Sequence, residues 1–258
     1  MTTISIITVC YNSEKYILDT IKSVNDQTYP HIEHVFIDGR SDDNTCKIIT
    51  ENSKRKYKLI SENDNGIYDA MNKGYRNSSG DVFAYLNSDD VYDSNDTLKH
   101  VMEKFESKTN VVYGDIYFVQ GSSMKRYWHT GQVPNSWQSG FQIPHPALFM
   151  RRRLFTDEHD IFDPKYKIAG DLKLQLSVFK KYIVNHTYLE EALVRMRLGG
   201  ASTRNLQAVI DGFIETRSAY NDVHCNGGLR YAVRKLLSKL RQKNTKRYPT
   251  QFKGKTHV

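Results

Sequence analysis

Apolar segments that alternate with amphipathic segments dominate residues 1–90 and constrain the fold class. The expected strands are residues 4–9, 33–37, 57–61 and 81–86, and apolar residues recur at helical spacing between them. Strands and helices alternating at this spacing form βαβ units, whose right-handed crossovers build a parallel sheet. The sequence therefore predicts an α/β fold with a mostly parallel central sheet.

Polar side chains follow each expected strand. They are Asn12, Asp38, Asp64 and Asp89. Because right-handed crossovers place the strand ends on one edge, we expect these residues to converge, although they are distant in sequence. Ligands of open α/β sheets bind outside the carboxyl ends of the strands. This edge is therefore the expected site for a cation or a polar ligand.

The fourth strand ends in the polar run Asn87-Ser88-Asp89-Asp90. Adjacent carboxylates at a strand end can hold a divalent cation such as Mg²⁺ or Mn²⁺ between the protein and substrate phosphates. Taken alone, Asp89 and Asp90 could equally start a turn or cap the next helix.

Two nucleotide-binding classes lack their motifs in this chain. There is no Gly-x-Gly-x-x-Gly after the first strand and no Gly-Lys-Ser/Thr loop, which disfavours dinucleotide dehydrogenases and P-loop enzymes. A nucleotidyltransferase is an alternative, but it would need a glycine-rich basic loop after the first strand, unlike residues 10–13. A catalytically inactive carbohydrate- or lipid-binding module is a second alternative.

Charge is unevenly distributed along the chain. The net charge is +8, yet ten Lys or Arg residues lie within 230–255 and no Asp or Glu follows Asp222. The nearly neutral body argues against nucleic-acid binding. We therefore predict a globular domain over 1–222 and a separate basic tail over 223–258.

The tail contains one amphipathic segment. Leu229, Val233, Leu236 and Leu240 share a helical stripe, and basic residues occupy the remaining circumference. Such a helix can bind an anionic membrane surface. The alternative is a helix whose apolar stripe docks on the body. No segment is long and apolar enough for a signal peptide or a membrane span, so we expect a cytoplasmic protein, peripheral on the inner face of the membrane.

Four segments together resemble the ordered motifs of family 2 glycosyltransferases with the GT-A fold. The stretch Gly-Ile-Tyr-Asp-Ala-Met-Asn-Lys-Gly is the most distinctive, and small bacterial exopolysaccharide and O-antigen enzymes, including colanic-acid-type fucosyltransferases, look similar. The segments are residues 5–12, 37–43, 61–74 and 86–90.

The resemblance implies a donor nucleotide lying across the strand ends, within residues 1–115. It also implies a metal motif at residues 87–89, in which an Asn replaces the first carboxylate. Asp89 is the better expected metal ligand and Asp90 the second. The donor nucleotide-binding residues implied are Thr8, Tyr11, Asn12, Asp38, Asp64, Asp69, Lys73 and Ser88.

The resemblance places the acceptor half within residues 116–222. Asp171, at an expected helix start, matches the catalytic aspartate, although a helix cap is the simpler interpretation. His145, Trp137 and Arg197 are weaker candidates for acceptor contacts, because a packed loop histidine, a core tryptophan and a turn explain them equally well.

We therefore expect an inverting glycosyltransferase that uses a divalent cation, Mn²⁺ or Mg²⁺. The donor would be a UDP- or GDP-linked sugar, and the acceptor a polyprenyl-diphosphate-linked saccharide of bacterial surface polysaccharide biosynthesis.

Overall fold

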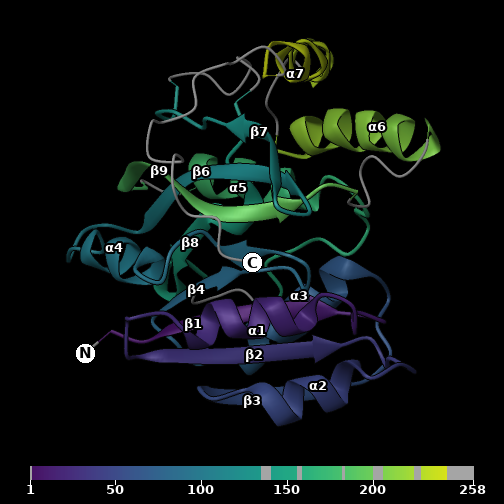
Figure 1. Cartoon of the computed structure of the whole chain (residues 1–258). Helices are drawn as coiled ribbons and strands as arrows, with labels where there is room; N and C mark the ends of the chain where they lie inside the picture. The colour runs from purple at the N-terminus through teal and green to yellow at the C-terminus, as the bar shows by residue number, and fades with distance from the viewer. Residues whose placement is uncertain are drawn as a thin grey trace.

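The computed structural model describes residues 2–134, 141–155, 159–181, 184–199, 206–223 and 228–242. It confirms the α/β class, with helices on both faces of one sheet (Figure 1). The strands are β1 (Ile4–Cys10), β2 (Ile32–Asp38), β3 (Lys56–Ser61), β4 (Val82–Tyr85), β5 (Val91–Tyr92), β6 (Val111–Gln120), β7 (Ser123–Trp128), β8 (Leu148–Arg151) and β9 (His186–Arg197). The helices are α1 (Ile17–Asn25), α2 (Thr45–Asn52), α3 (Ile67–Asn77), α4 (Thr97–Glu103), α5 (Gly170–Lys181), α6 (Leu206–Asp222) and α7 (Gly228–Gln242), with short 3-10 turns η2 (His145–Ala147) and η3 (Arg152–Phe155).

The sheet is parallel in its first half and mixed in its second. Its order is β3-β2-β1-β4-β8-β6-β9-β5, with β7 paired to β6. Strands β1 to β4 pair in parallel, as predicted. Strand β8 runs antiparallel to both β4 and β6, so the expectation of a mostly parallel sheet is wrong for this half. A parallel strand needs a crossover that returns the chain to the starting edge, whereas β8 is entered through η2 at the strand-end edge.

The register aligns the strand ends. Cys10 pairs with Asp38, Asp38 with Ser61, and Ile7 with Tyr85, so the segments after β1, β2, β3 and β4 leave the sheet at one edge. Strand β6, with ten residues, continues to Gln120.

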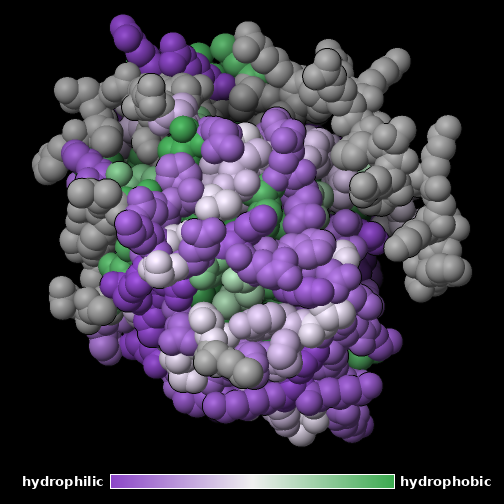
Figure 2. All heavy atoms as spheres, turned by 90° about the vertical axis from the view of Figure 1, so that its left-hand side faces the viewer, coloured by the Kyte–Doolittle hydropathy of each residue, from purple (hydrophilic) through white to green (hydrophobic). Residues whose placement is uncertain are grey.

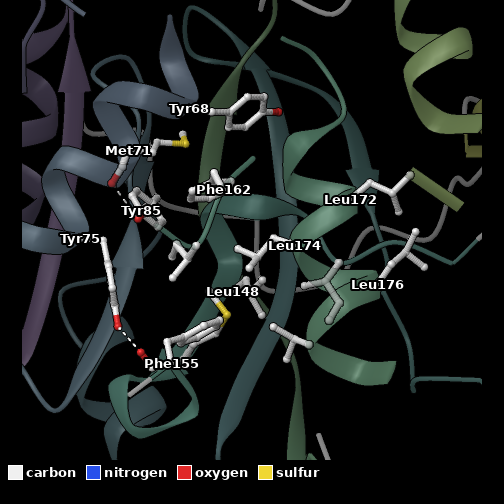
Figure 3. Packing of buried hydrophobic residues seen from close by; sticks show 14 of the residues in the cluster. Tyr68, Met71, Tyr75, Tyr85, Leu148, Phe155, Phe162, Leu172, Leu174 and Leu176 are labelled. Atoms are coloured by element: carbon white, nitrogen blue, oxygen red, sulfur yellow. Dashed lines mark hydrogen bonds between the residues drawn. The ribbon is translucent and has the colours of Figure 1, made fainter. Parts of the chain in front are cut away.

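Two helical layers cover the sheet. Helices α1, α2 and α4 bury Ile21, Ile49 and Leu98 on one face. Helices α3 and α5 share a large core on the other face, where Tyr68 and Leu172 belong to one cluster (Figure 3). A Cβ at Gly74 would lie 2.3 Å from the Ile7 side chain, so glycine lets α3 approach β1 closely.

Helices α6 and α7 lie together at the end of the molecule away from β3 (Figure 1). No helix in the described part of the chain has both the length and the apolar character needed to cross a membrane. The face on the left of Figure 1 is mainly hydrophilic where it is not covered by grey atoms (Figure 2).

Candidate active site

Asp38 ends β2 as a fully buried carboxylate. It accepts hydrogen bonds from the Ser41 hydroxyl at 2.5 Å, the Ser41 amide at 3.0 Å and the Ser61 hydroxyl at 2.6 Å. Burial raises the pKa of Asp38, but these bonds to Ser41 and Ser61 outweigh it, so the pKa lies below its ordinary value. The ionised side chain thus holds the ends of β2 and β3 together.

Gly39 brings two predicted nucleotide-binding residues together. A Cβ at Gly39 would lie 2.8 Å from Asp64 Oδ2 and 3.3 Å from the Tyr11 ring. Tyr11 is 63% exposed, so its ring is available to a ligand. Asn12 lies beside them, with its amide donating to the Ser41 hydroxyl at 2.8 Å and its side-chain oxygen accepting from the Asp42 amide.

Thr8, like Asp38, is a predicted donor residue that the structure keeps buried in the sheet. It is fully buried, and its hydroxyl lies 3.0 Å from His34 Nε2. Burial lowers the pKa of His34 to about 3, so this imidazole stays neutral. The structure therefore brings Tyr11, Asn12 and Asp64 to the open edge but not Thr8.

Asp90 is buried in the turn after β4. Its carboxylate accepts hydrogen bonds from the Asn87 side chain at 3.0 Å and the Arg197 amide at 3.2 Å. Burial and the neighbouring Asp89 raise the pKa of Asp90 well above its ordinary value. Both oxygens already have protein partners, so Asp90 stabilises the turn.

Asp89 is the carboxylate of this pair that fits a cation. Burial raises the pKa of Asp89, which means that a positive charge near this carboxylate would be favourable. No cluster of three or more His, Cys, Asp or Glu residues in the described ranges could hold a metal ion. Asp89 would be the residue to hold a divalent cation, which would supply positive charge for a phosphate-bearing ligand.

Arg197 fixes this turn to neighbouring elements. Its guanidinium donates to the Asp89 carbonyl at 3.0 Å and to Asp19 at 2.5 Å, and it lies over the Tyr16 ring. These contacts place Arg197 beside Asp89, the expected metal ligand.

Three further predicted donor residues lie in polar clusters at the edge. Lys73 pairs with Glu62 at 3.0 Å and lies 3.7 Å from Asp69. The Ser88 hydroxyl lies 2.9 Å from that of Ser13, which joins the segment after β4 to the segment after β1. The residues predicted from distant motifs therefore share one edge of the sheet.

Helix α3 connects this edge to the second half of the chain. Buried Asn72 donates to the Phe162 carbonyl at 2.8 Å and accepts from the amides of Ile161 and Phe162. The Tyr68 hydroxyl donates to the Ile168 carbonyl at 3.0 Å. Sequence reasoning missed this role of the Gly66–Gly74 stretch, because its partners lie about a hundred residues away.

Asp171 lies in the first turn of α5, directly after the segment that Asn72 and Tyr68 of α3 contact. Its amide donates to the Tyr68 hydroxyl at 3.3 Å, and its carboxylate accepts from the Gln142 side chain at 2.8 Å. The preceding residue is Gly170, where a Cβ would lie 2.7 Å from the Tyr68 ring. Glycine therefore lets the ring shown in Figure 3 approach the start of α5.

Two buried polar atoms near Asp171 lack partners. Within the described part of the chain, Gln142 Oε1 and His145 Nε2 have no hydrogen-bond partner. His145 stacks on Tyr85, the last residue of β4, with ring centres 5.3 Å apart. Burial lowers the pKa of His145, and the charge of Asp171 partly opposes this. Buried polar groups are normally paired, so these atoms mark a place for a polar ligand or water.

Another buried carboxylate, Asp115, lies within β6 rather than at a strand end. It accepts hydrogen bonds from the hydroxyls of Tyr127 and Tyr188 and, at 2.7 Å, from the Thr130 amide. His129 Nδ1 lies 3.3 Å from it. Sequence analysis singled out none of these partners.

Trp137, a weaker candidate for acceptor contacts, lies outside the described residues.

Comparison with known proteins finds one matching family model and several similar sequences. The model of the family "Glycosyl transferase family 2" matches residues 5–168. An uncharacterized glycosyltransferase of Mycobacterium tuberculosis is 36% identical over 178 residues, which is 66% of each chain. TuaG of Bacillus subtilis, whose name assigns it to teichuronic acid biosynthesis, is 36% identical over 103 residues, 39% of this chain and 40% of that one.

Two solved structures share the fold. TarS 1–349 of S. aureus, in complex with UDP-GlcNAc, has a TM-score of 0.64 at 16% identity, over 93% of this chain and 92% of that chain. The mannosyltransferase PcManGT of Pyrobaculum calidifontis, in complex with GDP-Man and Mn²⁺, has a TM-score of 0.61 at 14% identity, over 93% and 75%. The predicted GT-A fold is thereby confirmed, and the chain belongs to glycosyl transferase family 2.

Proposed function

We propose that the protein is an inverting glycosyltransferase that moves one sugar from a UDP- or GDP-linked donor to a lipid-linked saccharide. The observation that carries this proposal is Asp171, which lies at the start of α5 near two unpaired buried atoms, Gln142 Oε1 and His145 Nε2. Tyr68 joins Asp171 to α3, and α3 follows directly on the edge that holds Asp64. Donor and acceptor could therefore meet between these groups.

The arrangement suits a single displacement. Asp171 would accept the proton of the acceptor hydroxyl while that oxygen attacks the anomeric carbon. The bond between this carbon and the diphosphate oxygen breaks on the opposite face, and the nucleoside diphosphate leaves. A divalent cation held by Asp89, Mn²⁺ or Mg²⁺, would neutralise the charge on the leaving diphosphate.

Gln142 would position the base. Its side-chain amide donates to Asp171 Oδ2, while Asp171 Oδ1 accepts a hydrogen bond from the Leu172 amide at 2.8 Å, so the protein orients both carboxylate oxygens. This contact fixes the orientation of the Gln142 amide group. Gln142 Oε1 and His145 Nε2 would then bind sugar hydroxyl groups.

We further propose that the acceptor is linked to polyprenyl diphosphate, and that the tail, residues 223–258, holds the protein at the anionic cytoplasmic face of the membrane. The ten basic residues within 230–255 support this placement. The similarity to TuaG, named for teichuronic acid biosynthesis, supports a role in surface polysaccharide assembly. The UDP-GlcNAc and GDP-Man complexes of the structural neighbours support a nucleotide-sugar donor.

The test is substitution of the base. Donor sugars, among them UDP-GlcNAc and GDP-Man, are screened with Mn²⁺ for hydrolysis and for transfer to polyprenyl-diphosphate-linked saccharides. We expect Asp171→Asn to lose transfer by a factor of about 10² or more, because general-base catalysis typically contributes that much. The exposed Asp160→Asn is the control, and melting curves should show that both variants fold. Transfer by Asp171→Asn at nearly the wild-type rate would contradict the assignment of the base.

A further inference from the structure

The outer face of α6 carries four large apolar side chains that nothing in the described structure covers. Val209, Ile210, Phe213 and Ile214 are 47%, 45%, 39% and 56% exposed. Their spacing of one, three and four residues places them on one side of the helix. Exposed apolar side chains that are contiguous in this way mark an interaction surface more often than isolated ones.

The second half of α6 is firmly attached to the body. Thr216, Ala219 and Tyr220 are buried. The Glu215 carboxylate accepts hydrogen bonds from the amides of residues 167, 168 and 169, at 2.8 to 2.9 Å. Because the second half of the helix is fixed, the exposed apolar side chains of its first half belong to the surface of the fold.

Helix α7 presents a second apolar stripe in the same part of the molecule (Figure 1). It docks through buried Tyr231, whose ring centre lies 4.6 Å from that of Tyr220. Leu229, Val233 and Leu237 remain 58%, 46% and 51% exposed. Of the predicted stripe, Leu229 and Val233 are therefore exposed, whereas the side chains of Leu236 and Leu240 lie outside the described ones.

The charge of α7 identifies the partner, because α6 carries Asp211, Glu215 and Asp222 against one basic residue, Arg217, and contributes mainly apolar side chains. Exposed Arg230 lies on α7, and exposed Arg217 continues the outer face of α6 by one turn. No acidic residue follows Asp222 in the sequence, whereas ten basic residues do. Apolar side chains flanked by basic ones are typical of helices that lie in the interface of an anionic bilayer. The face in Figure 2, by contrast, is mainly hydrophilic where it is visible.

We infer that α6 and α7 together form one docking surface for an anionic phospholipid membrane, with the α6 face inserted beside the α7 stripe. The inference deepens the proposed function, because the basic tail alone was assigned to the membrane. Glu215 connects the same α6 to the residues directly before Asp171, so the membrane would lie next to the acceptor side of the site. A lipid-linked acceptor could then reach Asp171 without leaving the bilayer.

Vesicle flotation of the full-length protein tests this surface. The vesicles are DOPC alone or DOPC with DOPG at a ratio of 7:3. We expect wild-type protein to bind the DOPG vesicles, and Ile210→Ser/Phe213→Ser/Ile214→Ser to reduce binding at least tenfold. The α7 variant Leu229→Ser/Val233→Ser/Leu237→Ser should also lose binding. Tyr57→Ser, which removes an exposed ring from β3 at the other end of the sheet, is the control and should bind normally.

Several outcomes would overturn the inference. Undiminished binding of the α6 variant would show that α6 does not contact lipid. A wild-type dimer that the α6 substitutions dissociate, measured by light scattering, would assign the face to a second copy of the chain. Donor hydrolysis by wild-type protein without vesicles tests the proposed function separately. A failure of the membrane inference can therefore be distinguished from a failure of the proposed function.

Discussion

At the scale of single residues, the surroundings of Asp171 depend on Gly170, which has no side chain. Gly170 leaves room for the Tyr68 ring, which a Cβ would meet at 2.7 Å. The Tyr68 hydroxyl can then contact the Ile168 carbonyl and the Asp171 amide. Burial, and to a lesser degree the charge of Asp171, raises the pKa of Tyr68 well above its ordinary value. The hydroxyl therefore stays protonated and donates a hydrogen bond to the Ile168 carbonyl.

His34 should make stability depend on pH. Its pKa is about 3 in the folded protein, because it is buried, and about 6.5 in the unfolded chain. Below pH 6.5 the unfolded state therefore binds one more proton, and the free energy of unfolding falls as the pH falls toward 3. Between pH 7 and 5.5 this contribution is about 1 kcal/mol.

Urea unfolding of wild-type protein and His34→Gln at the two pH values measures the effect. The variant should lose about 1 kcal/mol less than wild-type protein over this interval. His186→Gln, on an exposed position of β9, is the control. Equal pH dependence in wild-type protein and His34→Gln would contradict a neutral buried imidazole.

The residues of the strand ends could be predicted from the sequence, because each follows its own strand directly. Asp38, Asp64 and Asp89 are examples, and the parallel register brings their segments to one edge. Gln142 could not be predicted, since it lies 29 residues before Asp171 in a segment without helical or strand periodicity. Its importance follows only from its contact with Asp171 and from the oxygen that it leaves unpaired.

At the scale of elements, α6 joins two properties that no local pattern reveals. Its apolar residues face outward, so its hydrophobic pattern does not indicate which side packs on the body. The helix is held to the body by Glu215, whose carboxylate accepts hydrogen bonds from three backbone amides of the segment before α5. This helix was absent from the expected elements, whereas the helix after β3 and the amphipathic helix of the tail were foreseen.

Glu215 is expected to act as a positioning residue for Asp171. Glu215→Gln replaces one of the two acceptor oxygens with a donor and removes the charge, so the three amides lose charge-assisted bonds. We expect a loss of about 1–3 kcal/mol in the free energy of unfolding. We also expect a severalfold fall in kcat with little change in the KM for the donor, because the donor edge is untouched.

Urea unfolding and steady-state kinetics of the same preparation check both effects, with exposed Glu190→Gln as the control. Glu215→Asp, which keeps the charge, should recover part of kcat. A purely structural role would lower stability and leave kcat per folded molecule at the wild-type value.

At the scale of the whole molecule, the two halves meet through α3. Asn72 and Tyr68 hold the segment that leads to Asp171, while Asp64, just before α3, lies at the strand-end edge. The first half follows from βαβ alternation and was predictable. The second half was not, because β8 inserts between β4 and β6, and pairing between strands so far apart in sequence leaves no local signal.

The central claim is that the strand-end edge binds a nucleoside diphosphate sugar through a cation at Asp89. Calorimetric titration of UDP and GDP, with and without Mn²⁺, tests it most directly. We predict that Mn²⁺ strengthens the binding of one of these nucleotides at least tenfold, and that Asp89→Ala removes this gain while the control Asp96→Asn retains it. Binding that is equally tight without Mn²⁺, or a Mn²⁺ effect that persists in Asp89→Ala, would contradict the account.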